Sequence, residues 1–397
     1  MISASMKEML KGSSVIRAMF EEGRRLNAIY GEENVFDFSL GNPSVPPPAE
    51  IEKVINEVLR EESPTVLHGY MSNMGYESAR SAIASALNNE FGENFTEAGI
   101  IMTVGAAGAL NTVFKTILDP GDEVIVFAPF FTEYKNYVAN YCGRIIISLP
   151  DPVTLAPDLK AFETLFTERT KAVIINSPNN PTGVIYDENT IKGICGILYA
   201  KQRQYGHEIY LVSDEPYRQL VYSDAKPPFL TKYYDNTFVA YSFSKTLSLP
   251  GERIGYLAVP GRMSGFEEIM GGLTVANRIL GFVNAPSLFQ KVVARCINMC
   301  CDISTYRRNR DVLYSELTRL GFECVKPEGA FYMYPKSPDA DDARFCGTAK
   351  KYNILLVPGS AFGYGGHFRL AYCTSREKVE KSIAAFEKLA EDVFGRK

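Results

Sequence analysis

The stretch Ser242-Phe243-Ser244-Lys245-Thr246-Leu247-Ser248-Leu249-Pro250-Gly251-Glu252-Arg253-Ile254-Gly255-Tyr256 decides how the rest of the chain is interpreted. It follows an apolar run, residues 237–241, that is typical of a buried strand. A lysine placed directly after such a strand is desolvated, which favours its neutral, nucleophilic form and suits Schiff-base chemistry. The nearby hydroxyls and Arg253 suit a phosphate group beside that lysine. The same residues also fit a strand end followed by a polar turn, so the remaining sequence must decide.

The composition is that of a soluble globular protein. The 397 residues are 46% hydrophobic and 22% charged, and the length allows one large and one smaller domain. A formal net charge of −4 gives no indication of binding to nucleic acid or to an acidic membrane surface. No run approaches the roughly 20 apolar residues that cross a bilayer, and residues 1–10 lack a signal-peptide pattern. We therefore expect a cytoplasmic protein with neither nucleic-acid nor membrane partners.

The eight cysteines predict neither a disulfide framework nor a metal site. No two of them have the C-x-x-C spacing of zinc ligands. Cys296, Cys300 and Cys301 lie close together on a predicted helix, with Cys296 and Cys300 one turn apart. We interpret all three as buried, small apolar residues. This cysteine usage favours a reducing compartment.

Helix-like and strand-like segments alternate through the first two thirds of the chain. Helical spacing is present at 15–26, 49–59, 79–91 and 109–118. Short Val- and Ile-rich runs predict strands buried on both faces of a mainly parallel sheet. These runs are 100–104, 123–127, 144–149, 172–176, 209–213, 237–241 and 255–259. We expect an α/β domain with a mainly parallel seven-stranded sheet flanked by helices.

The C-terminal third has a different rhythm and predicts a smaller α+β domain. A helix-like stretch, 286–320, leads to short predicted strands at 322–325, 331–334, 354–357 and 368–373. Thr374 and Glu377 fit a capping box at the start of a final helix. We divide the chain into an N-terminal segment (1–45) that contributes to the small domain, a large domain (46–285) and the C-terminal small domain (286–397).

Two segments with small or turn-forming residues follow predicted strands. Gly105-Ala106-Ala107-Gly108 joins a strand to a helix, where backbone amides and the helix dipole favour an anion, although a close-packed turn is an alternative. Residues 176–183, Asn-Ser-Pro-Asn-Asn-Pro-Thr-Gly, form a rigid turn directly after a strand. Such a position is where α/β proteins place ligand contacts, and a surface turn is the alternative.

Charged residues follow or interrupt two further apolar runs. Asp214 leaves a strand, with Tyr217 three residues later, and a buried carboxylate without a partner is costly. Asp214 therefore pairs either with a protonated heterocycle nitrogen or with a cation of the protein. Arg369 lies inside an apolar strand, where it is expected to meet a carboxylate in bidentate fashion. Whether that carboxylate belongs to the protein or to a substrate is not visible locally.

Taken in order, these segments resemble the fold type I pyridoxal-phosphate (PLP) enzymes, and among them the class I/II aminotransferases related to aspartate aminotransferase. The resemblance extends from Leu40-Gly41-Asn42-Pro43 to Arg369. It implies an aminotransferase that exchanges an amino group between an L-amino acid and a 2-oxo acid by a ping-pong mechanism through aldimine and ketimine intermediates. It leaves open whether the enzyme is of the aspartate or the aromatic type.

The resemblance also implies roles around the ring of the cofactor. Lys245 matches the lysine that holds PLP as a covalent Schiff base and then transfers the substrate's α-proton. Asp214 matches the carboxylate that pairs with the ring nitrogen, and Tyr217 and Asn180 match the groups beside the 3-hydroxyl. Many relatives stack a tryptophan on the ring, but this chain has none. Phe131 is therefore the expected stacking residue, since it offers an apolar π-face.

The remaining implied roles concern the phosphate and the substrate. The phosphate would be bound by the amides of Ala106 and Ala107, by Ser242 and by Arg253. The substrate α-carboxylate would be bound by Gly41, Asn180 and Arg369. Tyr70 resembles the tyrosine that reaches the phosphate of the neighbouring subunit, which implies a homodimer with shared active sites.

Of three other functions, a lyase is the nearest alternative, and two are disfavoured by features that they would ordinarily carry. A β-C–S lyase of the same fold would share the lysine, aspartate, tyrosine and arginine. A non-catalytic PLP-binding regulator would ordinarily carry a DNA-binding extension, and a nicotinamide dehydrogenase would carry the G-x-G-x-x-G pattern that is missing here. Specificity for the substrate side chain stays open. Arg278 is a candidate for binding a distal carboxylate, with an exposed or structural arginine as the alternative.

Overall fold

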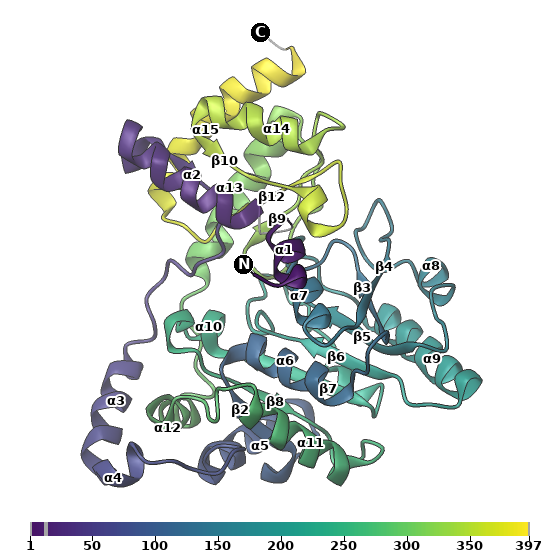
Figure 1. Cartoon of the computed structure of the whole chain (residues 1–397). Coiled ribbons are helices and arrows are strands. Elements are labelled where there is room, and N and C mark those ends of the chain that lie inside the picture. Colours follow the sequence, from purple (N-terminus) through teal and green to yellow (C-terminus); the bar gives the residue numbers. More distant parts are fainter. Residues whose placement is uncertain (1, 12–14, 396–397) are drawn as a thin grey trace.

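The chain folds into a larger and a smaller part, which lie one above the other in Figure 1. The computed structural model describes residues 2–11 and 15–395. The chain enters through two helices, α1 (Ala4–Lys11) and α2 (Val15–Tyr30). Helix α2 lies beside the C-terminal helices of the smaller part, so both ends of the chain contribute to it (Figure 1).

The larger part is built on a seven-stranded sheet with the order β2-β8-β7-β6-β5-β3-β4. Strands β7, β6, β5, β3 and β4 pair in parallel, whereas β8 is antiparallel to both of its neighbours. The strands are β2 (Ile100–Thr103), β3 (Glu123–Phe127), β4 (Arg144–Ser148), β5 (Thr170–Asn176), β6 (Tyr210–Asp214), β7 (Thr237–Ser242) and β8 (Gly255–Ala258). The predicted mainly parallel sheet is confirmed, and each predicted strand agrees with the structure to within two residues.

Both faces of this sheet are buried, which explains the unbroken apolar runs in the sequence. On β5, Ala172 and Ile174 point to the side covered by α6 (Gly105–Ile117) and α11 (Phe266–Ile279). Val173 and Ile175 point to the opposite side, which is covered by α9 (Glu188–Tyr205). The other helices of the larger part are α3 (Glu50–Glu61), α4 (Pro64–Leu67), α5 (Glu77–Phe91), α7 (Tyr134–Ala139), α8 (Leu159–Glu163), α10 (Phe243–Thr246) and α12 (Ser287–Arg295).

The smaller part combines two short sheets with α2 and three helices of the C-terminal third. A three-stranded antiparallel sheet has the order β11-β12-β9, and β1 pairs in parallel with β10. The elements are β1 (Phe36–Asp37), β9 (Tyr332–Met333), β10 (Ile354–Leu355), β11 (Val357–Pro358), β12 (Phe368–Ala371), α13 (Ser304–Leu320), α14 (Asp342–Ala349) and α15 (Arg376–Phe394). The expected smaller α+β domain is thus present.

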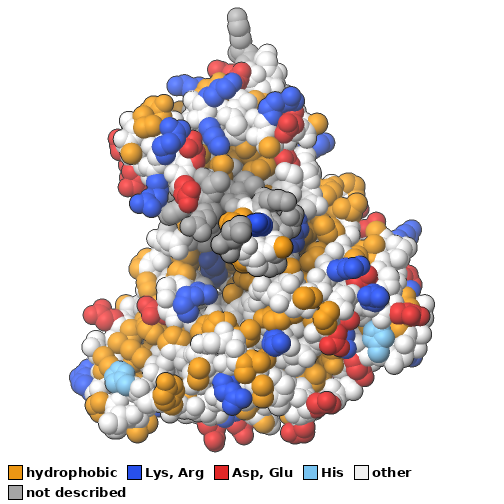
Figure 2. Space-filling view, in the orientation of Figure 1, with side chains coloured by type: hydrophobic (Ala, Val, Ile, Leu, Met, Phe, Trp, Pro, Cys, Tyr) orange, Lys and Arg blue, Asp and Glu red, His pale blue; other side chains and the backbone are white. Residues whose placement is uncertain are grey.

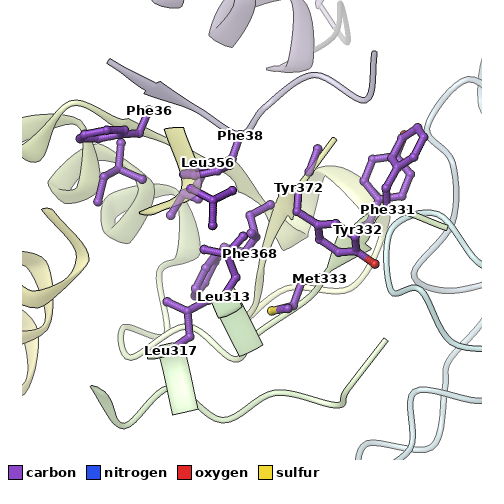
Figure 3. Packing of buried hydrophobic residues seen from close by; sticks show 14 of the residues in the cluster. Phe36, Phe38, Leu313, Leu317, Phe331, Tyr332, Met333, Leu356, Phe368 and Tyr372 are labelled. Carbon is purple, nitrogen blue, oxygen red and sulfur yellow. The ribbon is translucent and has the colours of Figure 1, made fainter. Parts of the chain in front are cut away.

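A continuous apolar core joins the N-terminal strand to the C-terminal elements. Phe36 and Phe38 lie in one buried cluster with Leu313, Leu356 and Phe368, as Figure 3 shows. This contact supports the division of the chain that we inferred, in which residues 1–45 contribute to the small domain. The exact domain bounds stay a prediction.

The stretch 286–320 is not one helix, so this prediction is wrong. Helix α12 ends at Arg295 and α13 begins at Ser304. The backbone between them is paired elsewhere, because the Cys301 amide donates to the carbonyl of Thr246 at 2.7 Å. Cys296 and Cys301 are buried as expected, but Cys300 is exposed, since it lies in this connection and not on a packed helix face.

Three further predictions differ from the structure: two element ends and one strand. Helix α6 begins at Gly105, so the Gly105–Gly108 segment is its first turn and not a connection before it. Helix α15 is capped by Ser375, whose hydroxyl accepts from the Lys378 amide at 3.2 Å, instead of by Thr374. Residues 322–325 are not a strand.

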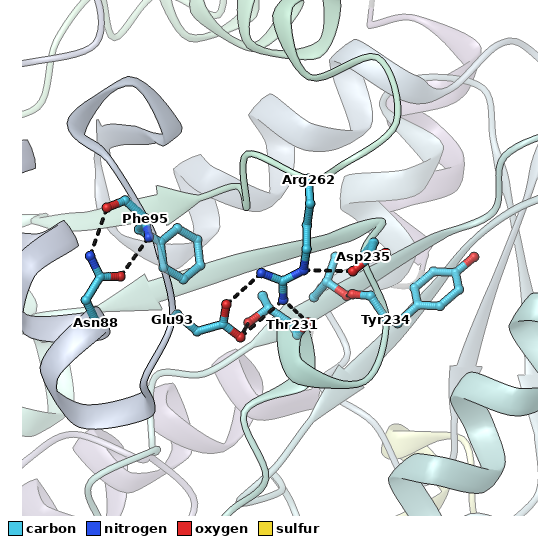
Figure 4. Close-up of polar contacts among 8 residues, drawn as sticks. Asn88, Glu93, Phe95, Thr231, Tyr234, Asp235 and Arg262 are labelled. Carbon is cyan, nitrogen blue, oxygen red and sulfur yellow. Dashed lines mark hydrogen bonds and ion pairs between the residues drawn. The ribbon is translucent and has the colours of Figure 1, made fainter.

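An arginine holds three segments of the larger part together at the end of the sheet (Figure 4). The Arg262 guanidinium donates to Glu93 at 2.7 Å and to Asp235 at 2.7 Å. Glu93 is buried and also accepts from the Thr231 hydroxyl at 2.9 Å. Because a buried carboxylate needs such partners, we assign Arg262 a structural role.

The surface view shows cationic and anionic side chains mixed over the visible face, with an indentation between the two parts (Figure 2). No helix in the described ranges is long and apolar enough to span a bilayer. Those ranges also contain no cluster of three or more His, Cys, Asp or Glu side chains that could hold a metal ion.

Candidate active site

A cavity of about 340 Å³ lies where the carboxyl ends of the central strands meet the smaller part. In the larger part, the cavity is lined by polar residues at or after the carboxyl ends of β5, β6 and β7. In the smaller part, it is lined by residues of β9 and β12. The predicted site residues that line it are Gly41, Ala106, Ala107, Phe131, Asn180, Asp214, Tyr217, Ser242, Lys245, Arg253 and Arg369. The fold therefore brings together residues that are up to 328 positions apart in the sequence.

Lys245 reaches the cavity from the short helix α10, directly after β7. The Ser242 hydroxyl caps this helix by accepting from the Ser244 amide at 3.2 Å. The Lys245 ammonium donates to the carbonyl oxygen of Gly41 at 2.7 Å and lies 5.3 Å from the centre of the Phe331 ring. Burial lowers the pKa of Lys245 to about 8, so the neutral amine is accessible near physiological pH.

Asp214 ends β6, and only one of its two carboxylate oxygens has a hydrogen-bond partner among the described residues. Its Oδ2 accepts a hydrogen bond from the Tyr134 hydroxyl at 2.5 Å, whereas Oδ1 is buried without a hydrogen-bond partner among the described residues. Burial raises the pKa of Asp214 to about 7, and the bond from Tyr134 opposes this shift. A buried carboxylate oxygen left unpaired costs free energy, so this geometry provides a place for a donor or a cation.

Arg369 lies on β12, in the smaller part, and lines the same cavity as Asp214. Its guanidinium is stacked between the rings of Tyr332 and Phe362, at 4.8 and 4.7 Å from their centres. One nitrogen donates to Asn180 Oδ1 at 3.2 Å and another donates to the carbonyl of Ser39. Nε has no acceptor within the part of the chain that the structure describes. Burial lowers the pKa of this arginine, and a carboxylate ligand would compensate the buried charge.

The part of the cavity formed by α6 and Arg253 is suited to an anion. The thirteen-residue helix α6 presents its N-terminus there, with Ala106 and Ala107 in the first turn. Gly105 has a φ of +76°, and a Cβ on it would lie 3.0 Å from a guanidinium nitrogen of Arg253. The positive φ favours glycine at position 105, and Arg253 lies beside the helix N-terminus.

The comparisons with known proteins agree with this geometry. The family model of aminotransferase class I and II matches residues 33–386. The chain belongs to the class I and II aminotransferases. The aspartate aminotransferase of Thermotoga maritima is 30% identical over 359 residues, which cover 89% of this chain and 91% of that protein. The probable aspartate/prephenate aminotransferase of Aquifex aeolicus is 31% identical over 374 residues, with coverages of 91% and 92%.

Two solved structures extend the likeness to three dimensions. An amino transferase from Eubacterium rectale is 44% identical and superposes with a TM-score of 0.96 over 99% of each chain. The Thermus thermophilus aspartate aminotransferase with maleate is 26% identical, with a TM-score of 0.86, covering 98% of this chain and 100% of that one. Enzymes of this family depend on PLP, so the cavity can be tested for its fit to that cofactor.

The residues of this aminotransferase fit the cofactor. The unpartnered Asp214 Oδ1 suits a protonated ring nitrogen, and the helix N-terminus with Arg253 and Ser242 suits a phosphate. A primary amine, Lys245, lies on the same cavity. Phe131 lines it as well and contacts the Tyr134 ring edge to face, with centres 5.5 Å apart; its stacking on the cofactor ring stays a prediction.

Two predicted residues lie outside the cavity. Tyr70 is 96% exposed and follows α4, so it does not contribute to the site of its own chain. This placement is compatible with the predicted contact to a neighbouring subunit, which stays a prediction. Arg278 lies exposed in the last turn of α11 and does not line the cavity that this chain forms.

Sequence reasoning missed three residues that shape the site. Tyr134 binds Asp214, and the Asn176 amide donates to the Asp214 carbonyl at 2.8 Å. Tyr332 lines the cavity, with its hydroxyl 3.0 Å from that of Tyr217. Asn176 begins a segment that was recognised, but Tyr134 and Tyr332 stand among 23 tyrosines with no local pattern that marks them.

The lysine pKa gives a prediction for cofactor uptake. Only the neutral amine attacks a carbonyl, so the apoprotein should combine with PLP faster as the pH rises, with a midpoint at about 8. Below this pH the ammonium form dominates and the rate should fall. The measurement is the rate of absorbance change after PLP is added to apoprotein between pH 6 and 10. A midpoint near the ordinary lysine value of about 10.4 would contradict the desolvated environment.

Proposed function

We propose that this aminotransferase exchanges an amino group between an L-amino acid and a 2-oxo acid, with Lys245, Asp214 and Arg369 as its central residues. One observation carries the proposal. Two buried polar atoms, Oδ1 of the Asp214 carboxylate and Nε of the Arg369 guanidinium, have no partner among the described residues, and both residues line the cavity together with Lys245. Such atoms are costly unless ligands pair with them, one cationic and one anionic.

PLP, when bound, supplies an electron sink for the negative charge that develops at the substrate Cα. Lys245 would hold it covalently, as the resemblance implies. Asp214 would keep the ring nitrogen protonated, and Tyr217 and Asn180 would contact the 3-hydroxyl. The phosphate would be bound by the α6 amides of Ala106 and Ala107, by Ser242 and by Arg253.

Arg369 would orient the substrate by its α-carboxylate. The guanidinium is already fixed by its two aromatic neighbours and by Asn180, so little conformational entropy is lost when the carboxylate binds. The Lys245 amine donates to the Gly41 carbonyl at 2.7 Å, and Gly41, Lys245 and Arg369 line the same cavity, so Nζ would face a substrate bound there. Lys245 Nζ would then accept the proton from the substrate α-carbon and later donate it again, so the lysine would act first as general base and then as general acid.

The names of the similar enzymes favour aspartate as an amino donor. Both curated relatives described above carry aspartate in their names, and one also carries prephenate. Among the described residues, the cations that line the cavity are Lys245, Arg253 and Arg369, and each already has a role. A cation for a distal carboxylate would therefore come from a neighbouring subunit, and the exposed Arg278 remains a candidate for that role.

A homodimer with shared active sites is part of the proposal. The Tyr70 ring is 96% exposed, which is unusual for a side chain of this size unless it contacts another chain. Val66, Val275, Ile279 and Phe282 are also large apolar side chains that are exposed in the single chain. A contact between two copies would cover them and bring Tyr70 to the phosphate site of the partner.

A panel of amino acids tests the proposed reaction. We expect aspartate to convert the bound aldehyde form of the cofactor to its amino form, seen as an absorbance change, and 2-oxoglutarate or another 2-oxo acid to reverse it. The control is cysteine or cystathionine without an oxo acid. A β-C–S lyase would release pyruvate and ammonia from these compounds catalytically, and that result without conversion by any amino acid would contradict the aminotransferase reaction.

A further inference from the structure

Tyr332 occupies the point where the two halves of the site meet. It lies on β9, which pairs with β12 so that Tyr332 is opposite Ala371, two residues from Arg369. The side chain is 3% exposed and lines the cavity. Its ring covers one face of the Arg369 guanidinium, 4.8 Å from the ring centre. Its hydroxyl lies 3.0 Å from that of Tyr217, on the larger part.

The hydroxyl of Tyr332 also determines why residue 41 is glycine. A Cβ on Gly41 would overlap the Tyr332 hydroxyl, and the two neighbouring ring carbons would be in its way as well. The Gly41 carbonyl is the acceptor for the Lys245 ammonium at 2.7 Å. The Tyr332 side chain therefore contacts the Gly41 backbone beside Lys245, the Tyr217 hydroxyl and the Arg369 guanidinium.

We propose that Tyr332 is a positioning residue that couples the Arg369 clamp to the Tyr217 hydroxyl, so that substrate binding and the cofactor environment depend on each other. The proposal rests on the proposed function of this cavity, because the roles of Tyr217 and Arg369 come from it. Tyr332 is not a catalytic residue in this scheme. It acts by holding two other side chains and the Gly41 backbone in place.

The number of protons on the two phenols determines which hydroxyl donates to the other. A hydroxyl has one proton to donate, and Tyr217 needs its own proton for an oxygen of the ligand. Tyr332 can satisfy this requirement by donating to the Tyr217 oxygen, which leaves the Tyr217 proton free. Because the two rings pack edge to face with centres 5.7 Å apart, the hydroxyls have little freedom to separate.

The test compares Tyr332→Phe, Tyr217→Phe and the double variant as PLP-loaded enzymes. Two quantities are measured: the midpoint of the absorbance change of the bound cofactor with pH, and the dissociation constant for an α-methyl amino acid, which binds but has no α-proton to lose. We expect Tyr332→Phe to move the midpoint in the same direction as Tyr217→Phe. We expect it to weaken the α-methyl amino acid about 3- to 10-fold, the usual effect of one lost hydrogen bond.

In the double variant the midpoint should equal that of Tyr217→Phe alone, because the hydroxyl of Tyr332 then has no partner to act on. Tyr334→Phe is the matched control. It removes an equally buried phenol hydroxyl two residues away, which bonds the carbonyls of Gly359 and Tyr364 and lies outside the cavity. An unchanged midpoint in Tyr332→Phe, additive shifts in the double variant, or the same changes in Tyr334→Phe would each overturn the coupling.

The outcomes separate this inference from the proposed function. If the unmodified protein shows no absorbance change with any amino acid, the function itself fails. If the unmodified protein reacts, and Tyr332→Phe has the same absorbance midpoint and the same dissociation constant as the unmodified protein, only the coupling fails. Cofactor content and thermal unfolding of each variant establish that the comparison is made between folded, loaded enzymes.

Discussion

Lys245→Ala should lower kcat by at least about 10⁴-fold, the largest effect that we expect from any single substitution in this chain. The lysine has two proposed tasks, since it holds the cofactor and transfers the α-proton, and alanine performs neither. Its amine is partly buried, bonded to Gly41 at 2.7 Å and partly deprotonated at neutral pH. Among the described residues, the other cations on the cavity are two guanidinium groups, which are too basic to replace it. The measurement is the rate of 2-oxo acid formation under saturating amino acid.

Two further variants show which property of Lys245 matters. Lys245→Arg keeps a positive charge but loses the nucleophilic amine, so its activity should be as low as that of the alanine variant. Lys135→Ala removes a lysine that is exposed and outside the cavity, and its rate should match the unmodified enzyme. An arginine variant with more than about a hundredth of normal turnover would show that charge, not amine chemistry, is what position 245 supplies.

The sequence was sufficient for the larger part of the fold because its strands carry their own signal. A strand buried on both faces must be apolar at every position, so 172–176 and 237–241 could be read without knowledge of their neighbours. The same argument located the site, since Asp214 and Lys245 each follow such a strand, and carboxyl ends of parallel strands meet at one edge of the sheet. Their roles came from the family resemblance, not from these patterns.

The parts that could not be predicted depend on contacts between distant segments. The break between α12 and α13 is stabilised by a hydrogen bond from the Cys301 amide to the carbonyl of Thr246, the last residue of α10. Tyr134 and Asp214 are 80 residues apart, and Tyr217 and Tyr332 are 115 apart. A single sequence shows no period or spacing that links such pairs. Polar residues that complete a site from another element are therefore harder to predict than residues at strand ends.

Arg369→Ala should weaken amino acid and 2-oxo acid binding by about 2–5 kcal/mol, which is about 30-fold or more in the dissociation constant. The guanidinium is 2% exposed, so its pair with a carboxylate would be shielded from water. Its Nε has no acceptor among the described residues, and the bonds to Asn180 and Ser39 fix the orientation of the group. The loss should appear in KM for both substrates, measured by steady-state rates, and in the dissociation constant of an unreactive substrate analogue.

The matched comparison is Arg253→Ala, which removes the other guanidinium group that lines the same cavity. If Arg253 binds the phosphate and Arg369 the substrate, the first variant should lose cofactor on dialysis while the second retains it. Arg369→Lys should recover only part of the affinity, because a single ammonium cannot reproduce the bidentate geometry of the fork. Normal substrate saturation in Arg369→Ala, with cofactor lost instead, would place the carboxylate clamp elsewhere and exchange the roles of the two arginines.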